Sequence, residues 1–159
     1  MNVQISAQEI SEKVGAVVDE CVGLEGPLLP ILLGVQQEFG FVPQAALRII
    51  AEKLNLSRAE VHGVMTFYHD FREQPAGRHV LKICRAEACQ AMGGDHMAER
   101  AQEALGVGWN ETAEDGSVTL EPVYCLGLCA CAPSAMLDGR VVGRLDDDRL
   151  EKIIDEVRR

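Results

Sequence analysis

Apolar residues recur at helical spacing in four segments of the first 72 residues. A capping box, in which a serine is followed three residues later by a glutamate, precedes the first and the fourth segment: Ser6-x-x-Glu9 and Ser57-x-x-Glu60. Proline or glycine residues bound the second and third segments: Pro27, Gly40 and Pro43. We therefore predict an N-terminal bundle of four short helices over residues 1–74.

Five of the seven aromatic residues fall in this helical region, where we expect them to pack in its core: Phe39, Phe41, Phe67, Tyr68 and Phe71. The turn-like sequence at 74–77 then ends the helical pattern. A region of about 70 residues forms a marginal domain by itself. We expect it to pack on the second region, on a partner, or on both.

The pattern after residue 75 alternates between strands and helices. It predicts a strand over 79–83 that ends at Cys84, a helix from Asp95 to 105, and a strand over 118–124 that ends at Cys125. Asp138-Gly139 then predicts a hairpin between strands 134–137 and 141–145, and an acidic run from 146 starts a last helix. The resulting β-α-β-β-β-α order predicts an α+β protein, with a thioredoxin-like domain over 75–159 after the helical bundle.

Four cysteines form two pairs, one after each of the first two predicted strands. Cys84 and Cys89 have the spacing C-x4-C, and Cys125 and Cys129 have the spacing C-x3-C. In a right-handed β-α-β unit the two strands are parallel, and their carboxyl ends meet at one edge of the sheet. We therefore expect the four sulfur atoms to converge.

Four converging thiolates suit either a [2Fe-2S] cluster or a tetrahedral zinc ion, and the wider loops slightly favour the cluster. A thioredoxin-type thiol exchanger is a third possibility, although the chain has no C-x-x-C spacing. Cys131, two positions after Cys129, could be a substitute ligand, a resolving thiol or a packed bystander, and we favour the bystander. Cys21 is interpreted as a small apolar residue of a helix face. The four histidines have no spacing that suggests a metal pair.

The net charge is −10, from 15 basic and 25 acidic residues, so nucleic-acid binding is not expected. The longest apolar stretch, 28–35, is far too short to span a membrane and contains Pro30. No export signal is visible, which predicts a cytoplasmic protein without membrane insertion. The chain has no dinucleotide fingerprint, Walker A motif or catalytic dyad, so we expect it to bind neither NAD nor a nucleotide phosphate by itself.

Several longer motifs carry a resemblance to a known family. They are PLLPILLGVQQEFGFVP, VHGVMTFYHDF, PAGRHVLKIC and CLGLCACAP, in this order, together with the four paired cysteines. The chain resembles the thioredoxin-like [2Fe-2S] subunit, the 24-kDa type, of NADH:quinone oxidoreductase and related NAD-linked complexes. Within that family the loop CRAEACQ looks most like the gamma subunit of molybdenum-containing NAD-dependent formate dehydrogenase. The quinone-reductase and NAD-reducing hydrogenase subunits are close alternatives.

The resemblance implies that Cys84, Cys89, Cys125 and Cys129 are the ligands of one [2Fe-2S] cluster. It also implies a flavoprotein partner that binds FMN and NAD(H), and a molybdenum-containing subunit that oxidises formate. The helical N-terminal region would pack on the flavoprotein, and the chain would carry electrons without being the catalytic subunit. Arg85, beside a ligand, is a candidate for tuning the cluster potential, with Glu87 opposing it; an alternative is that Arg85 is solvated or paired with a partner.

Overall fold

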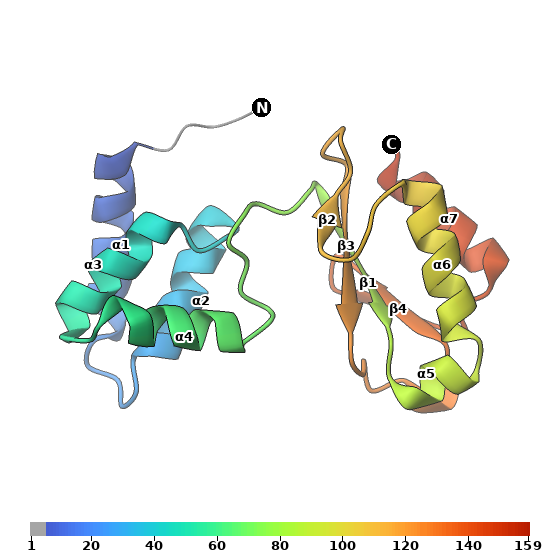
Figure 1. The fold of residues 1–159 in the computed structure, drawn as a ribbon, viewed down its shortest axis with the longest axis horizontal. Helices are drawn as coiled ribbons and strands as arrows, with labels where there is room; N and C mark the ends of the chain where they lie inside the picture. The colour runs from blue at the N-terminus through green and yellow to red at the C-terminus, as the bar shows by residue number, and fades with distance from the viewer. Residues whose placement is uncertain (1–5) are drawn as a thin grey trace. The chain divides into compact units, whose positions relative to one another are not determined.

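The computed structural model describes residues 6–159. The chain divides into two compact units after Pro75, with the bounds Met1–Pro75 and Ala76–Arg159 (Figure 1). The sequence places this division one residue earlier. Residues 1–5, which belong to the predicted helical region, lie outside the described residues. Each unit has its own apolar core.

The first unit consists of four helices, as the periodicity predicts: α1 Ala7–Cys21, α2 Leu28–Phe39, α3 Gln44–Leu54 and α4 Arg58–Phe67. The capping box at α4 is complete, because Ser57 Oγ accepts from the Glu60 N–H and Glu60 Oε2 accepts from the Ser57 N–H. At α1 the structure gives the Ser6 half of the motif, with Ser6 Oγ accepting from the Glu9 N–H, while the Glu9 carboxylate lies 3.4 Å from Lys13 Nζ.

Apolar side chains from all four helices form the core of the first unit. The largest of the fully buried ones are Ile31, Leu32, Leu47, Ile50 and Met65. Of the five aromatic residues expected in this core, Phe39 and Phe71 pack against it, whereas the expectation is wrong for Phe67 and Tyr68. Phe67 is 73% exposed and Tyr68 is 44% exposed, because both lie where α4 ends and the chain leaves the helix.

The second unit is built on a five-stranded sheet with the order β2-β3-β1-β4-β5. Its strands are β1 His79–Cys84, β2 Glu111–Thr112, β3 Val118–Val123, β4 Ser134–Leu137 and β5 Arg140–Gly143. Its helices are α5 Glu87–Ala91, α6 Gly94–Leu105 and α7 Asp147–Val157, and a 3₁₀ turn, η1, spans Cys129–Cys131. These elements confirm the predicted α+β fold class.

The central pair of strands, β1 and β3, is parallel, while β4 pairs with β1 in the antiparallel direction. The register places Cys84 opposite Val123, so both strands end at the same edge of the sheet. In Figure 1, α6 and α7 lie side by side on one face of this sheet. Strand residues that point to that face are fully buried against them, Leu81, Ile83 and Leu120 among others. The core thus fixes the strand ends from which the cysteine loops leave.

The hairpin predicted at Asp138-Gly139 is confirmed, since both residues have positive φ (48° and 85°), as a two-residue turn requires. Two elements escaped prediction: the five-residue helix α5 and the two-residue strand β2, both too short for a periodic signal. The predicted N-cap Asp95 is corrected as well, because α6 begins at Gly94 after Gly93. None of the helices within residues 6–159 combines the length and the apolar character needed to cross a membrane.

Candidate metal centre

Two strand ends place the first cysteine of each pair. Cys84 is the last residue of β1 and is buried, and Cys125 lies two residues after β3 ends at Val123. Because β1 and β3 are parallel, both cysteines leave the sheet at its carboxyl edge. The structure therefore places Cys84 and Cys125 at the same edge of the sheet, as the predicted parallel β-α-β topology requires.

Two short turns bring the second cysteine of each pair back toward the first. Cys89 lies in α5, is buried, and its side chain forms a hydrogen bond with that of Cys84. Cys129 begins η1, and its Sγ atom lies 3.7 Å from Cys125 Sγ. The charges of Cys84 and Cys89 also act on Cys129, so the two pairs are neighbours. All four are free thiols.

Backbone N–H groups point at the sulfur atoms from both loops. The N–H groups of Ala86, Leu126 and Cys125 donate to Cys84 Sγ, and that of Gly127 lies 3.4 Å from Cys125 Sγ. The second loop turns sharply to achieve this: Cys125 has φ 112° and Gly127 has φ 77°. Positive φ at a non-glycine residue is uncommon and is concentrated at functional sites. The backbone is therefore arranged to stabilise negative charge on sulfur.

The thiols differ in acidity. Burial raises the pKa of Cys84, but hydrogen bonds from the Ala86 N–H and the Cys89 side chain outweigh it, so the pKa lies below its ordinary value. Burial raises the pKa of Cys89, and the neighbouring Cys84 adds to the effect. The hydrogen bond with Cys125 and the negative charge of that residue raise the pKa of Cys129. Thiolate is the form that ligates metal, so the lowered pKa of Cys84 favours the ligating form, and the raised pKa values of Cys89 and Cys129 oppose it.

Ser134 is a neighbour of the site that sequence reasoning missed. It is the first residue of β4 and is buried, and its Oγ atom lies 3.5 Å from Cys89 Sγ. The Ser134 N–H also donates to that sulfur. The two residues are 45 positions apart, so no local spacing could have revealed the contact. The pairing of β4 with β1 creates it.

Arg85, the predicted tuning residue, is neither fully solvated nor free. Its Nη2 atom lies 3.0 Å from Asp95 Oδ1, and its guanidinium lies over the Trp109 ring at 5.4 Å from the centroid. The carboxylate that opposes Arg85 in the structure is thus that of Asp95, whereas the sequence suggested Glu87. The positive charge beside Cys84 is largely balanced within the unit.

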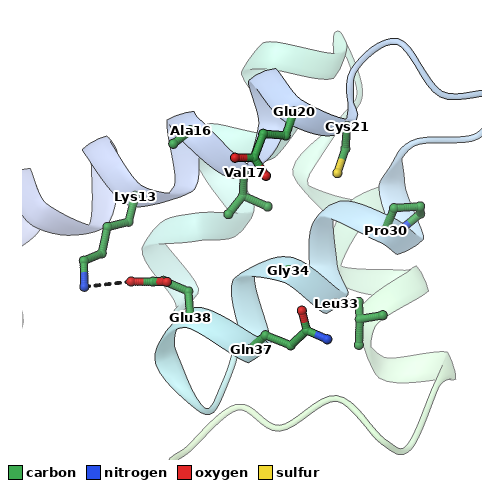
Figure 2. A pocket seen from close by; sticks show the side chains of 10 residues that line it. All are labelled: Lys13, Ala16, Val17, Glu20, Cys21, Pro30, Leu33, Gly34, Gln37 and Glu38. Atoms are coloured by element: carbon green, nitrogen blue, oxygen red, sulfur yellow. Dashed lines mark ion pairs between the residues drawn. The ribbon is translucent and has the colours of Figure 1, made fainter.

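The remaining two cysteines have packing roles in the structure. The Cβ atom of Cys131 lies so close to Gly143 that a side chain there would approach it to 2.9 Å, and its carbonyl accepts from the Arg144 N–H. Cys21 lines an open groove of about 550 Å³ between α1 and α2 (Figure 2). Ala16, Val17, Pro30 and Leu33 are among the other residues that line it, and a Lys13–Glu38 ion pair of 2.8 Å lies at one end. This groove brings together no group of donors comparable to the paired cysteines.

In the contacts described for residues 6–159, histidines contact carboxylates and none of the paired cysteines. Three contact single carboxylates, the closest contact being 2.7 Å between His79 Nδ1 and Asp138 Oδ2. Among residues 6–159, no three His, Cys, Asp or Glu side chains are grouped so as to hold one metal ion. The cysteines form two adjacent pairs instead. Four sulfur donors, two per loop, surrounded by N–H groups, form a donor set that fits a [2Fe-2S] cluster.

Comparisons with known proteins agree with this chemistry. Residues 14–158 match the family described as thioredoxin-like [2Fe-2S] ferredoxin. An NADH-quinone oxidoreductase subunit from Pseudomonas aeruginosa is 37% identical over 121 residues, which cover 76% of this chain and 73% of the relative. The corresponding subunit from Mycobacterium tuberculosis is 34% identical over 98% of this chain, which spans 59% of the relative's length. NADP-reducing hydrogenase subunit HndA of Solidesulfovibrio fructosivorans is 28% identical over 94% of this chain and 87% of its own length.

Among solved structures, the fold matches that of an NAD⁺-reducing [NiFe]-hydrogenase in its H₂-reduced state. The TM-score is 0.68 at 22% sequence identity, over 80% of this chain and 22% of the hydrogenase chain. At this identity the match supports the fold alone. The four cysteines, rather than this match, indicate the chemistry of the site.

Proposed function

Since the chain belongs to the thioredoxin-like [2Fe-2S] ferredoxin family, we propose that it is the electron-transfer subunit of an NAD-linked oxidoreductase complex. Membership of the family confirms the predicted [2Fe-2S] cofactor. The observation that carries the proposal is the meeting of two cysteine pairs at the carboxyl edge of the parallel strands β1 and β3. Nothing else in the described residues gathers comparable redox-capable donors.

We assign the four cluster ligands to Cys84, Cys89, Cys125 and Cys129. When bound, a [2Fe-2S] cluster accepts and releases one electron at a time. This chain's own residues hold the thiolates in place and stabilise their charge through backbone N–H groups such as those of Ala86 and Gly127. The buried pair, Cys84 and Cys89, is shielded from water, whereas Cys125 and Cys129 are exposed and give electrons a path to a partner.

The partner we propose is a flavoprotein that binds FMN and NAD(H). A flavin exchanges a hydride with nicotinamide but passes electrons singly to iron–sulfur centres, so a [2Fe-2S] carrier beside it is chemically matched. The relatives are subunits of a quinone oxidoreductase and of a hydrogenase that reduces NADP. Both names describe multi-subunit oxidoreductases, which supports such an assembly.

We further propose that the complex is a cytoplasmic, molybdenum-containing formate dehydrogenase. The support is the loop CRAEACQ around the first cysteine pair, which resembles the gamma subunit of that enzyme. NADH:quinone oxidoreductase and NAD-reducing hydrogenase are the competing assignments. In each of them the substrate is bound by another chain, so the three differ in their partners and not in the role of this subunit.

The helical unit, residues 1–74, is proposed to dock on the flavoprotein. Large apolar side chains remain exposed at the α1–α2 connection and on α2: Val22, Leu24, Leu29 and Leu33. Leu33 also borders the groove of Figure 2. Exposed apolar surface concentrated on two adjacent elements is typical of a protein–protein interface.

Anaerobic purification of the full chain tests the proposal directly. We expect a coloured protein with about two irons and two sulfides per chain, whose visible absorption bleaches on addition of dithionite. A colourless protein with one zinc would instead indicate a structural metal site, and a metal-free protein with a reactive thiol would indicate thiol exchange. Either result contradicts the proposed function.

Purification of the tagged chain with its native partners tests the assignment of the complex. A formate dehydrogenase predicts that the purified assembly contains molybdenum and FMN and reduces NAD⁺ with formate. Reduction of NAD⁺ with hydrogen, or oxidation of NADH by a quinone without formate activity, would instead select one of the competing complexes. Recovery of the assembly in the soluble fraction of lysed cells is the expected result for a cytoplasmic complex.

A further inference from the structure

A buried hydroxyl contacts the site from outside both cysteine loops. We propose that Ser134 is a positioning residue that raises the reduction potential of the cluster by donating a hydrogen bond to Cys89 Sγ. This inference rests on the proposed function, because it concerns a cluster held by Cys89. Neither the family match nor the names of the relatives assigns a role to this residue.

The sheet holds Ser134 in place. In the antiparallel pairing of β1 and β4, Ile83 lies opposite Ala135, and one further step in this register brings Ser134 beside Cys84. On its other side Ser134 is paired with Gly143 of β5. Ser134 is therefore fixed by two neighbouring strands, and only 1% of it is exposed. A hydroxyl held this firmly loses little entropy when it forms a hydrogen bond.

The direction of the hydrogen bond follows from the chemistry of the sulfur. The Oγ–Sγ distance of 3.5 Å is within hydrogen-bonding range for sulfur. In a free thiol either atom could donate, but a cysteine that ligates iron is a thiolate and carries no proton. Its sulfur can then only accept, so Ser134 becomes the donor. The Ser134 N–H adds a second donor to the same sulfur.

A donor at a ligand sulfur favours the more negative state of the cluster. The cluster and its four thiolates carry a charge of about −2 when oxidised and about −3 when reduced. A hydrogen bond to Cys89 Sγ is stronger in the reduced state because the sulfur carries more negative charge. Burial enhances the difference, since no water competes for the sulfur at Ser134. The hydroxyl therefore stabilises the reduced cluster more than the oxidised one.

The test compares hydroxyl-containing and hydroxyl-free side chains of equal size. Ser134→Thr keeps the donor and Ser134→Val removes it, while Ser134→Ala removes it without added bulk. Ser117→Ala is the matched control, because Ser117 is also buried but precedes β3 at the opposite end of that strand from Cys125. The full chain is purified anaerobically, iron and sulfide are assayed, and the midpoint potential is measured by redox titration followed by visible absorption and EPR.

We expect Ser134→Ala and Ser134→Val to lower the equilibrium constant for reduction about fivefold, which is about 40 mV for a one-electron couple at 59 mV per tenfold. Ser134→Thr and Ser117→Ala should stay near the wild-type potential. The spectroscopic signals report only loaded chains, so partial loading of a variant does not hide its potential. An unshifted potential in both hydroxyl-free variants overturns the role of Ser134 and leaves the proposed function standing. Wild-type chain without a reducible cluster would overturn the proposed function itself.

Discussion

Arg85 and Asp95 form an ion pair of 3.0 Å next to Cys84, and the Arg85 guanidinium also lies over the Trp109 ring. The pair links the residue after the first ligand to the first turn of α6. Because the two charges oppose each other, the net field at the cysteines is smaller than that of Arg85 alone. The side chain of Arg85 is 26% exposed and that of Asp95 55%, so solvent and salt weaken each charge further.

Removing the charge of either Arg85 or Asp95 should therefore shift the midpoint potential of the cluster, and removing both charges should restore it. We expect Asp95→Asn to raise the potential, because Arg85 then favours the reduced cluster, and Arg85→Gln to lower it. The double variant should lie near the wild-type value. Redox titration at low and high salt checks this, and both single shifts should shrink in high salt. Single variants that shift the potential in the same direction, or a double variant far from the wild-type value, would contradict the compensation.

Gly94 allows α6 to begin directly beside Cys89. A Cβ atom at this buried position would lie 2.6 Å from the Cys89 carbonyl oxygen and 2.9 Å from its carbonyl carbon, both backbone atoms that cannot swing away. We expect Gly94→Ala to displace the α5 loop and to reduce iron and sulfide content markedly. Gly63→Ala, in the helical unit and with no atom near the added methyl group, is the control. Full cluster loading of Gly94→Ala would show that the loop tolerates the shift.

Cys131 follows Cys129 by two positions, but the base of its side chain packs against Gly143. We expect Cys131→Ser and Cys21→Ser to retain about two irons per chain, and Cys129→Ser to lose the cluster or hold it in an altered form. Iron and sulfide assays with EPR distinguish the outcomes. A normal cluster in Cys129→Ser that disappears in the Cys129→Ser, Cys131→Ser double variant would identify Cys131 as a substitute ligand.

The capping box of α4 should stabilise the helical unit. Removal of a serine N-cap costs about 1 kcal/mol, so Ser57→Ala should lower the midpoint of urea unfolding. A Ser57→Thr variant, which keeps the hydroxyl, should recover most of the loss.

The same motif should make the stability depend on pH. Hydrogen bonds from the Ser57 backbone N–H and the Ser57 hydroxyl lower the pKa of Glu60. A carboxyl whose pKa is lowered on folding adds stability above its unfolded pKa, and this contribution is lost as the pH falls through the folded pKa. Glu60→Ala should therefore be less stable than wild type at pH 7, with the difference shrinking in acid. A difference independent of pH would contradict the ionic part of the cap.

Local sequence patterns were sufficient to predict most of the helices and strands. Helical periodicity with flanking prolines and glycines gave α2 its ends, Leu28 and Phe39, and Asp138-Gly139 gave the hairpin. Such signals fail for elements of two to five residues, so α5 and β2 were missed. They also say nothing of exposure at a helix end, which is why Phe67 and Tyr68 were wrongly expected in the core.

The sequence by itself determined the two cysteine pairs, their position after two strands, and the parallel topology that brings those strand ends together, because strand order and handedness follow general rules. Only the tertiary structure decided what surrounds the sulfur atoms. Asp95 opposes Arg85, and Ser134 reaches Cys89, from elements that are distant along the chain. Such contacts depend on the register of β4 on β1 and on the start of α6, which packing of the whole unit sets and no local spacing encodes.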